Sequence, residues 1–386
     1  MQIEPFKLER YFAKYEFKVK YLLSPSDCEP IKMAELLKMA SFESLKLWEN
    51  LKLSYTESQG HSLLRREVAN LYKNISDDDL LIAAPEEAIF IAMNTLLKPD
   101  DHLIAISPAY QSLYQIAHAK GCSITNWELQ LKPNSNNNLD PGTLNGTSSW
   151  SIDIDFLKQN INDKTRMIVI NFPHNPTGHT LSRSEFDAII DIARRYGIYI
   201  FSDEMYRFLE FSPSDKLPSV SDVYEKGISL SGMSKSFALP GLRIGWLATQ
   251  DTNLIQKWLE FKDYTTICNS SPSEILAIMA LQNKKELIRR NLEIISKNIS
   301  IAEQFFQNNN DLFSWVRPKA GSVAFPKLLG DFQVEKFCKK ILEDKEIMIV
   351  YGELFGFFGN HFRIGLGREN FGEIIDILDS YLKNNF

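Results

Sequence analysis

Residues 229–246 read SLSGMSKSFALPGLRIGW and place Lys235 in a short, hydroxyl-rich loop, eight residues before Arg243. A lysine that is partly removed from water and lies near a second cation loses its proton readily, and its free amine can form a Schiff base with a carbonyl. A guanidinium such as that of Arg243 suits a phosphate ester, and Ser234 and Ser236 add hydroxyl donors. These residue types suggest a site for a phosphorylated aldehyde, although an ordinary loop with solvent-exposed charges would look the same.

Two further polar segments each follow a run of strand length. Residues 171–178 read NFPHNPTG and follow the strand-like run 166–170, whereas residues 202–206 read SDEMY and follow the run 198–201. In open parallel sheets, ligands bind beyond the carboxyl ends of the strands. Both segments therefore predict side chains that meet a ligand at one edge of a parallel sheet.

The elements that would position these side chains alternate between two patterns. Strand-like runs cover residues 103–106, 166–170 and 198–201, and helical patterns cover residues 112–120 and 185–196. This alternation predicts βαβ units and a mainly parallel sheet.

Local signals predict where some elements begin and end. Ser182 followed by Glu185 predicts a capping box, and Gly197 stands where that helix would stop. Residues 288–306 carry apolar side chains at steps of four and three, which predicts an amphipathic helix. The polar, turn-rich run 134–150 is predicted to be a surface loop or a short excursion, and not a linker between domains.

Composition limits the classes of function. The chain has 386 residues, of which 44% are hydrophobic, enough for a large core in two domains or in one domain with a lobe. A net charge of −6 without a polybasic block argues against a nucleic-acid partner, and no apolar stretch reaches the length of a membrane span. Residues 1–9 lack the apolar core of a signal peptide, so we expect a cytoplasmic protein. The four cysteines show no metal-ligand spacing, so we expect no metal site.

The motifs NPTG, SDEMY, SKSF and GLRIGW occur in this order along the chain. With this ordered set the chain resembles the fold type I pyridoxal phosphate (PLP) enzymes, and among them the class I and II aminotransferases of the aspartate aminotransferase superfamily. The resemblance runs from about Ser54 to near the C-terminus and implies PLP as the cofactor.

The same resemblance implies a three-layer α/β fold, with a mainly parallel sheet in a large PLP-binding domain and a second, smaller α/β domain. The large domain would cover residues 42–281. The small domain would combine residues 1–41 with residues 282–386, and the helix over 288–306 would lead from one domain into the other.

The resemblance also implies a role for each motif residue around the cofactor ring. Lys235 would hold the aldehyde as a Schiff base and move a proton to and from the substrate's α-carbon. Asp203 would pair with the ring nitrogen, and Asn175 and Tyr206 would donate to the phenolic oxygen. Tyr110, in the run SPAY, would stack on the ring. Taken singly, these residues would also suit a helix cap, a turn or a core aromatic position.

The expected phosphate site departs from the commoner family pattern. Arg243 is the expected anchor of the phosphate, but the helix-opening turn contains Pro85 and Glu86 where many relatives have a glycine-led turn. Proline lacks an N–H donor, although it suits the first helical position, and a carboxylate adds negative charge near a dianion. Gly232 stands where several relatives carry a serine three residues before the lysine, and Ser234 or Ser231 would have to substitute for it. How the phosphate is held is therefore open at this stage.

Tyr55, in the run YTESQG, matches the tyrosine that reaches the phosphate of the neighbouring subunit in the family. If this match holds, the active site is complete only in a homodimer. The other interpretation is a buried aromatic side chain beside Gly60 and Leu64.

Arg363, in the run HFRIGLG, matches the arginine that binds the substrate α-carboxylate as a bidentate pair, next to Asn175. This match implies an amino acid substrate, whereas an arginine in such a place can also form a structural salt bridge. Residues 24–29 and 319–323 would lie near the substrate, and the carboxylates within 24–29 either attract a basic side chain or are solvated. His174 is interpreted as structural.

The function implied is an aminotransferase that exchanges the amino group between an L-amino acid and a 2-oxo acid through a lysine Schiff base. A β-elimination, replacement or cyclisation enzyme on the same scaffold is the alternative, because NFPHNPTG, LPGLRIGW and GSVAFPKL also resemble the capreomycidine synthase type of enzyme. A regulatory binding module is disfavoured, because the segment before Ser54 is too short and too weakly basic for a DNA-binding region.

Overall fold

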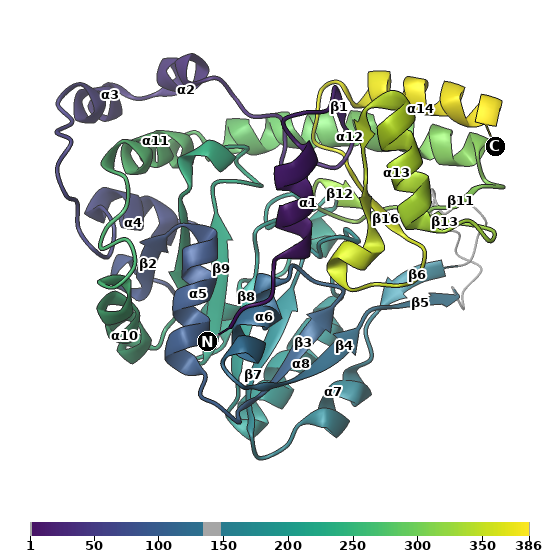
Figure 1. The fold of residues 1–386 in the computed structure, drawn as a ribbon. Helices are drawn as coiled ribbons and strands as arrows, with labels where there is room; N and C mark the ends of the chain where they lie inside the picture. Colours follow the sequence, from purple (N-terminus) through teal and green to yellow (C-terminus); the bar gives the residue numbers. More distant parts are fainter. Residues whose placement is uncertain (1, 134–147, 386) are drawn as a thin grey trace.

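The computed structural model describes residues 2–133 and 148–385. Its centre is a seven-stranded sheet (Figure 1). In spatial order the strands are β2 (Leu80–Ala83), β10 (Gly245–Ala248), β9 (Gly227–Gly232), β8 (Tyr199–Asp203), β7 (Thr165–Asn171), β3 (His102–Ser107) and β4 (Ser123–Glu128). Strand β10 runs antiparallel to both of its neighbours, and the other pairs are parallel. The predicted mainly parallel sheet is confirmed.

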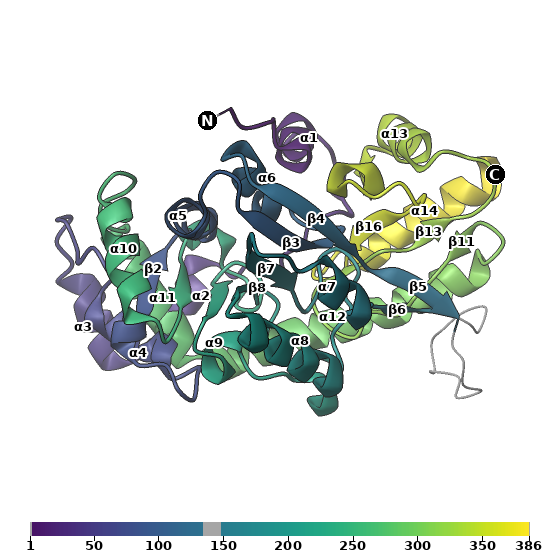
Figure 2. The same ribbon diagram turned by 90° about the horizontal axis from the view of Figure 1, so that it is seen from below.

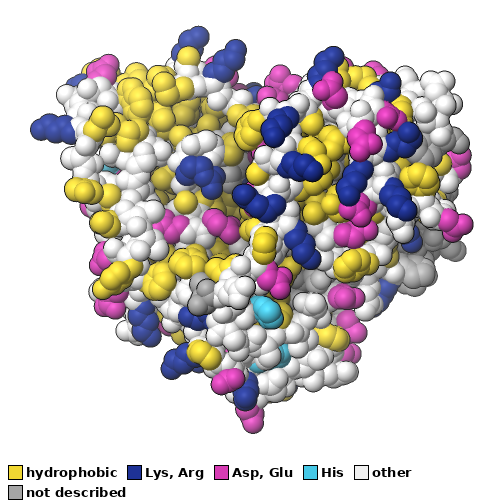
Figure 3. Space-filling view, viewed as in Figure 1, with side chains coloured by type: hydrophobic (Ala, Val, Ile, Leu, Met, Phe, Trp, Pro, Cys, Tyr) yellow, Lys and Arg dark blue, Asp and Glu magenta, His cyan; other side chains and the backbone are white. Residues whose placement is uncertain are grey.

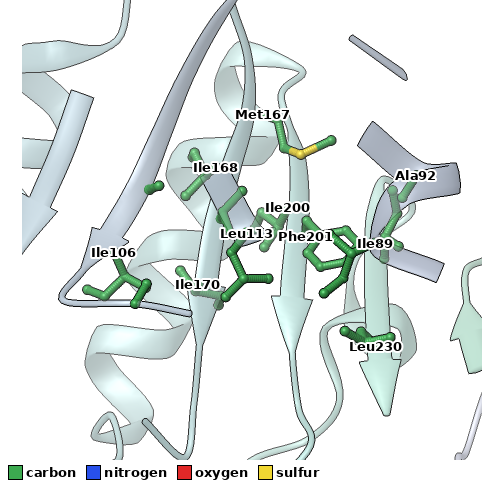
Figure 4. Close-up of a cluster of buried hydrophobic side chains, with 14 of the residues drawn as sticks. Ile89, Ala92, Ile106, Leu113, Met167, Ile168, Ile170, Ile200, Phe201 and Leu230 are labelled. Carbon is green, nitrogen blue, oxygen red and sulfur yellow. The ribbon is translucent and has the colours of Figure 1, made fainter. Parts of the chain in front are cut away.

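Helices cover both faces of this sheet, which explains why its inner strands are almost continuously apolar. Helices α5 (Pro85–Leu96) and α6 (Ser112–Ala119) lie on one side and α8 (Arg183–Tyr196) on the other (Figure 2). Side chains of α5 and α6, such as Ile89 and Leu113, meet Ile170 and Phe201 of the strands in one buried cluster (Figure 4). The chain therefore has the predicted three-layer α/β architecture.

The predicted helix signals are confirmed. Ser182 Oγ accepts from the Glu185 N–H, and Glu185 Oε2 accepts from the Ser182 N–H at 2.7 Å, so the capping box starts α8. Gly197 ends that helix at φ 65°, a left-handed conformation that glycine adopts without a steric penalty. The amphipathic helix is α12 (Lys284–Asn308), which extends beyond the predicted span at both ends.

The remaining helices surround the sheet or build a second layer beside it. They are α1 (Lys7–Tyr15), α2 (Met33–Met39), α3 (Phe42–Glu49), α4 (Ser62–Ala69), α7 (Ile154–Asn160), α9 (Val220–Val223), α10 (Thr252–Lys262), α11 (Ser271–Gln282), α13 (Val334–Lys345) and α14 (Phe371–Asn385).

Both ends of the chain contribute to the part of the molecule beside α12. Its strands are β1 (Tyr21–Leu22), β14 (Ile347–Met348), β11 (Phe313–Ser314), β13 (Lys327–Leu328), β12 (Val323–Ala324), β16 (Phe362–Gly365) and β15 (Val350–Tyr351). Strand β1 pairs with β14, and Leu23 and Cys28 enter a buried cluster with Phe306, Trp315 and Phe337. The expected domain boundaries stay a prediction; Leu36 of α2 packs in the cluster that contains β2 and α11 residues.

The prediction of a surface loop over residues 134–150 is wrong at its end. Residues 134–147 lie outside the described part of the chain, but Ser148–Ser151 form strand β6, which pairs with β5 (Gln130–Pro133). Trp150 is buried, and its ring contacts Phe325, Phe357 and His361. Tertiary packing of this one aromatic ring overrides the polar character of its neighbours.

Within the described residues, no helix is long and apolar enough to cross a bilayer. Over the same part of the chain, no group of His, Cys, Asp and Glu side chains has the arrangement of a metal site. Cys28, Cys122 and Cys338 are buried free thiols, and Cys268 is partly exposed.

We expect Ser182→Ala to lower the free energy of unfolding by about 1 kcal/mol, because the Glu185 N–H at the start of α8 loses its acceptor, Ser182 Oγ. Urea denaturation monitored by circular dichroism measures this. Ser300→Ala, an exposed position within α12, is the matched control and should change the free energy by less than about 0.5 kcal/mol. Equal losses in the two variants would contradict the capping role.

Candidate active site

One cavity of about 370 Å³ collects ten of the eleven predicted site residues. They are Pro85, Glu86, Tyr110, Asn175, Asp203, Tyr206, Ser234, Lys235, Arg243 and Arg363. The cavity lies at the carboxyl ends of β8 and β9, where the topology of a parallel sheet places ligands, and β16 and α1 close its other sides. A cavity of this size suits a small-molecule ligand.

Lys235 follows β9 and extends into this cavity. Its Nζ donates to Ser26 Oγ at 2.8 Å. Burial lowers the pKa of Lys235, and the positive charge of Arg363 lowers it further, whereas Asp27 and Glu9 act in the opposite direction. The second cation expected near this lysine is therefore Arg363, which comes from a distant part of the chain. Lys235 has the environment of an amine that gives up its proton more readily than a surface lysine.

Asp203 ends β8 and is buried. Its Oδ1 accepts from the Met205 N–H at 3.1 Å, and burial raises its pKa to about 6. A buried carboxylate is costly unless a donor or cation faces it. Within the described residues Asp203 forms no ion pair closer than 4 Å, so its environment suits a protonated ring nitrogen in the cavity.

Arg363 and Asn175 contact each other across the cavity wall. Arg363 Nη1 donates to Asn175 Oδ1 at 3.1 Å, and Nη2 donates to the Ser24 carbonyl at 2.9 Å. A guanidinium has only donors, so it must meet the amide oxygen of Asn175 and leave the amide NH₂ to donate elsewhere. This orientation suits the predicted bond from Asn175 to a phenolic oxygen.

Arg363 itself is only 1% exposed, and its Nε has no hydrogen-bond partner. The rings of Phe355 and Phe12 lie 5.1 and 5.9 Å from its guanidinium carbon. No carboxylate forms a salt bridge with it within the described residues, so the structural salt bridge considered above is not formed. A buried guanidinium with an unused donor is suited to bind a carboxylate.

The two tyrosines of the cavity have partners on the N-terminal segment. Tyr206 donates to the Ser26 carbonyl at 2.9 Å, and Tyr110 donates to Glu9 Oε1 at 2.7 Å. The Tyr206 hydroxyl must therefore leave the Ser26 carbonyl, or accept in addition, to serve a cofactor oxygen. The Tyr110 ring packs against Phe6, with ring centroids 4.7 Å apart.

At the expected phosphate end, Arg243 and Ser234 both line the cavity. Arg243 follows the turn Pro240–Leu242 in the left-handed conformation, at φ 55°, and donates to the Pro240 carbonyl. Ser236, considered above as a further donor, does not serve this role. It is buried behind the loop, and its hydroxyl hydrogen bonds to the carbonyls of Met205 and Arg207.

The two departures from the family pattern fit together in space. Gly232 of β9 is paired with Gly245 of β10, and the Pro85 ring lies over this pair. A Cβ at Gly232 would lie 3.2 Å from Pro85 Cγ, and one at Gly245 would lie 2.8 Å from it. A serine at position 232 would therefore crowd the proline ring. The first turn of α5 still has the N–H groups of Glu86 and Glu87.

Glu86 stands at the start of α5 and accepts from Ser112 Oγ at 3.3 Å. Burial raises its pKa to about 7, so near neutral pH this carboxyl is partly protonated. A partly neutral Glu86 repels a phosphate less than the carboxylate assumed from the sequence.

Tyr55 is the one predicted residue outside the cavity. Its side chain is 85% exposed, so it is not the buried aromatic considered above.

His174 is buried and structural as predicted, because its Nε2 contacts the Pro108 carbonyl and its Nδ1 contacts Thr177 Oγ1. Burial lowers the pKa of His174 to about 3, which keeps it neutral.

Sequence reasoning missed the contribution of the N-terminal helix. Leu8, Glu9 and Phe12 of α1 and Glu16 at its end line the cavity, and Ser26 hydrogen bonds to Lys235. The apolar residues of α1 recur at helical spacing, which is the signal that would have predicted this helix. Of residues 24–29, which were expected near the substrate, Pro25, Ser26 and Asp27 line the cavity.

The residues present fit PLP. The cavity holds a lysine with a lowered pKa, a buried carboxylate without a cation, and two guanidinium groups. Each has the chemistry needed for one part of PLP or of an amino acid: the aldehyde, the ring nitrogen, the phosphate and the α-carboxylate.

Comparisons with known proteins agree with this interpretation. The family model described as aminotransferase class I and II matches residues 49–375. A PLP-dependent aminotransferase from Streptococcus suis 89-1591 superposes with a TM-score of 0.88 at 29% identity, over 100% of this chain and 99% of that one. A PLP-dependent cyclase, OrfR, superposes with a TM-score of 0.86 at 25% identity, again over 100% and 99%.

Capreomycidine synthase from Streptomyces vinaceus is 27% identical over 271 residues. The match covers 70% of this chain and 65% of that enzyme, so this chain spans just under two thirds of the length of that relative.

The folded-state pKa of Asp203, about 6, exceeds its usual value of 3.8, so the apoprotein loses stability as the pH rises through this interval. We expect Asp203→Asn to make the apoprotein more stable than the wild type by about 3 kcal/mol at pH 8, with the difference shrinking between pH 6 and pH 4.

Urea denaturation of the apoproteins at several pH values measures this difference, and Asp311→Asn, an exposed position, is the control. Equal stability of wild type and Asp203→Asn at pH 8 would contradict the buried charge. After loading with PLP we expect the order to reverse, because only the carboxylate pairs with a protonated ring nitrogen.

Proposed function

Because this chain belongs to the class I and II aminotransferase family, we propose that it exchanges the amino group between an L-amino acid and a 2-oxo acid. PLP is its cofactor. The observation that carries the proposal is the buried Arg363 guanidinium, with its unused Nε, in the same cavity as Lys235. This pair provides one group for an α-carboxylate and one amine for proton transfer, as an amino acid substrate requires.

When bound, PLP supplies an aldehyde that takes up an amino group and a protonated ring that withdraws electrons. Lys235 moves a proton to and from the substrate's α-carbon. Its lowered pKa favours the neutral amine that accepts this proton, and Ser26 Oγ holds Nζ by a hydrogen bond of 2.8 Å.

Arg363 orients the substrate. Its contacts with Asn175 and the Ser24 carbonyl fix the plane of the guanidinium before a substrate arrives. Because the group is desolvated and already oriented, a carboxylate that binds it loses little further freedom. Burial destabilises the Asp203 carboxylate, and a cation that faces it would stabilise it, so we propose that it pairs with the ring nitrogen.

We also propose that two copies of the chain assemble and that Tyr55 acts in the site of its partner. The segment that carries Tyr55 is anchored: Thr56 Oγ1 donates to Glu274, and Lys262 Nζ donates to the Ser58 carbonyl at 2.9 Å. A fixed segment with an exposed aromatic ring is typical of an interface anchor.

The surroundings of Tyr55 support this assembly. Leu53, Tyr264 and Ile267 are also exposed, and apolar side chains gather on the side of the molecule that carries α2, α3 and α11 (Figure 3). A groove of about 450 Å³, lined by Phe6, Phe90 and Ile116 among others, adjoins the catalytic cavity at Glu86. It offers room for the Tyr55 ring of a second copy.

A cytoplasmic location stays a prediction from the sequence.

Cyclisation or β-elimination of an amino acid in the same cavity is the second candidate. It is favoured by the similarity to capreomycidine synthase and to the cyclase OrfR. The cofactor residues would be the same for either reaction, so the reaction products are what distinguishes the two candidate functions.

We expect the PLP-loaded enzyme, mixed with one L-amino acid and no oxo acid, to release one equivalent of 2-oxo acid and to convert its cofactor to pyridoxamine phosphate. Addition of a second 2-oxo acid should restore the aldehyde form. Absorbance spectra and chromatography of the products measure both steps. Lys235→Ala should lower the rate by about 1,000-fold or more, whereas Lys257→Ala, an exposed lysine of α10, should not. Ammonia or a ring product without pyridoxamine phosphate would favour the second candidate.

The role of Tyr55 across the interface predicts complementation between two defective chains. Tyr55→Ala should weaken cofactor binding by about 10-fold or more, since a hydrogen bond to a charged phosphate is lost. A heterodimer of Lys235→Ala with Tyr55→Ala has one site with both residues intact, so it should show about half of the wild-type activity per dimer. If Tyr55 acts within its own subunit, the heterodimer would not exceed the activity of its Tyr55→Ala subunit alone.

A further inference from the structure

Acidic side chains outnumber basic side chains in the lining of the catalytic cavity. Three cations line it, Lys235, Arg243 and Arg363, and five carboxyl groups line it, Glu9, Glu16, Asp27, Glu86 and Asp203. The proposed function assigns Lys235 to the aldehyde, Arg243 to the phosphate and Arg363 to the substrate carboxylate. Every cation of the lining is then used, whereas only Asp203 among the carboxylates has a partner on the cofactor.

Three of the four remaining carboxyl groups have a hydrogen-bond or ion-pair partner within the protein. Asp27 forms an ion pair with Arg368, at 3.0 Å. Glu86 lies at the first turn of α5, where it accepts from Ser112, and belongs to the phosphate end. Glu9 accepts from the Tyr110 hydroxyl at 2.7 Å, but within the described residues neither Glu9 nor Glu16 forms an ion pair closer than 4 Å with a lysine or arginine.

Glu9 and Glu16 present their carboxylates to the same space. They are seven residues apart on α1 and its C-cap, which is two helical turns, so they lie on one face together with Phe12. All three residues line the cavity. Glu16 has a raised pKa because it is partly buried and because Asp27 and Glu9 repel its negative charge. Glu9 thus lies near enough to Glu16 to disfavour the charged form of Glu16.

The opposite end of the cavity points to a ligand independently. Arg363 is buried and has an unpartnered Nε, which suits a bound α-carboxylate. Phe12, on the same face of α1 as the two glutamates, lies 5.9 Å from its guanidinium carbon. An amino acid held at Arg363 therefore extends its side chain in a space that α1 borders.

We propose that the amino donor has a side chain that ends in a cation, an ammonium or a guanidinium, and that Glu9 and Glu16 bind it. This inference rests on the proposed function, since it takes the α-carboxylate to Arg363. A cation relieves the repulsion between the carboxylates and replaces the water that a substrate displaces from them. A side chain with its own carboxylate would add to the repulsion, and a neutral one would leave two partly desolvated negative charges without a cation.

The test compares L-lysine with L-norleucine and L-arginine with L-citrulline, because each pair has nearly the same length and differs in charge. We expect the PLP-loaded wild type to prefer the cationic member by about 10- to 100-fold in kcat/KM, with L-glutamate the poorest substrate. The preference should weaken with added salt, because the cavity mouth is partly exposed.

Glu9→Gln, Glu16→Gln and the double variant should bring the ratio within each pair to about one. Each ratio compares two substrates of the same variant, so a general change in activity does not alter it, and glutamine can still accept from Tyr110. Glu35→Gln, an exposed glutamate of α2, is the matched control and should leave the ratio unchanged. A wild type that favours norleucine or citrulline, or a double variant that keeps the wild-type ratio, would overturn the inference.

Calorimetric binding of lysine and norleucine to the loaded enzyme separates this inference from the proposed function. If no amino acid yields a 2-oxo acid but lysine binds more tightly than norleucine through Glu9 and Glu16, transamination fails and the inference stands. If norleucine is transaminated and lysine neither binds more tightly nor reacts faster, the inference fails and transamination stands.

Discussion

The site depends on the close approach of residues 23–29 to strand β16. The Gly365 N–H donates to the Leu23 carbonyl, and the Glu29 N–H donates to the Gly367 carbonyl. A Cβ at Gly365 would lie 1.9 Å from the Pro25 carbonyl oxygen, and one at Gly367 would lie 2.6 Å from that of Asp27. Only glycine permits this contact, and it brings a segment from the start of the chain against one from its end.

Much of the cavity follows from that contact. The Ser24 carbonyl accepts from Arg363, Ser26 Oγ accepts from Lys235, and the Ser26 carbonyl accepts from both Tyr206 and Ser322. The segment thus positions the amine, the guanidinium and one tyrosine together. Burial disfavours the charged form of each of these groups, because it lowers the pKa of Lys235 and Arg363 and raises the pKa of Asp203. Each pocket group is less stable in its charged form until a ligand of opposite charge arrives.

The sequence predicted the part of the site that local chemistry determines. Asp203 ends strand β8 and Lys235 follows strand β9, so the position of each in its motif was enough to bring both to one sheet edge. The sequence could not predict that Ser26 would hold Lys235, because 209 residues separate them and nothing in either segment indicates the other. The burial of Trp150 was not predicted for a related reason, since the aromatic rings that bury it come from a distant, C-terminal part of the chain.

The residues that were predicted and those that were missed serve two different kinds of specificity. The motif residues meet the cofactor and the α-carboxylate, which are common to all amino acid substrates of such an enzyme, and they lie within the family match over residues 49–375. Helix α1 lies outside that match, yet it lines the same cavity with two carboxylates and an aromatic ring. A family pattern that fixes the shared chemistry leaves this helix free to vary, so the face of α1 is where a choice among side chains can be encoded without disturbing the groups that every substrate needs.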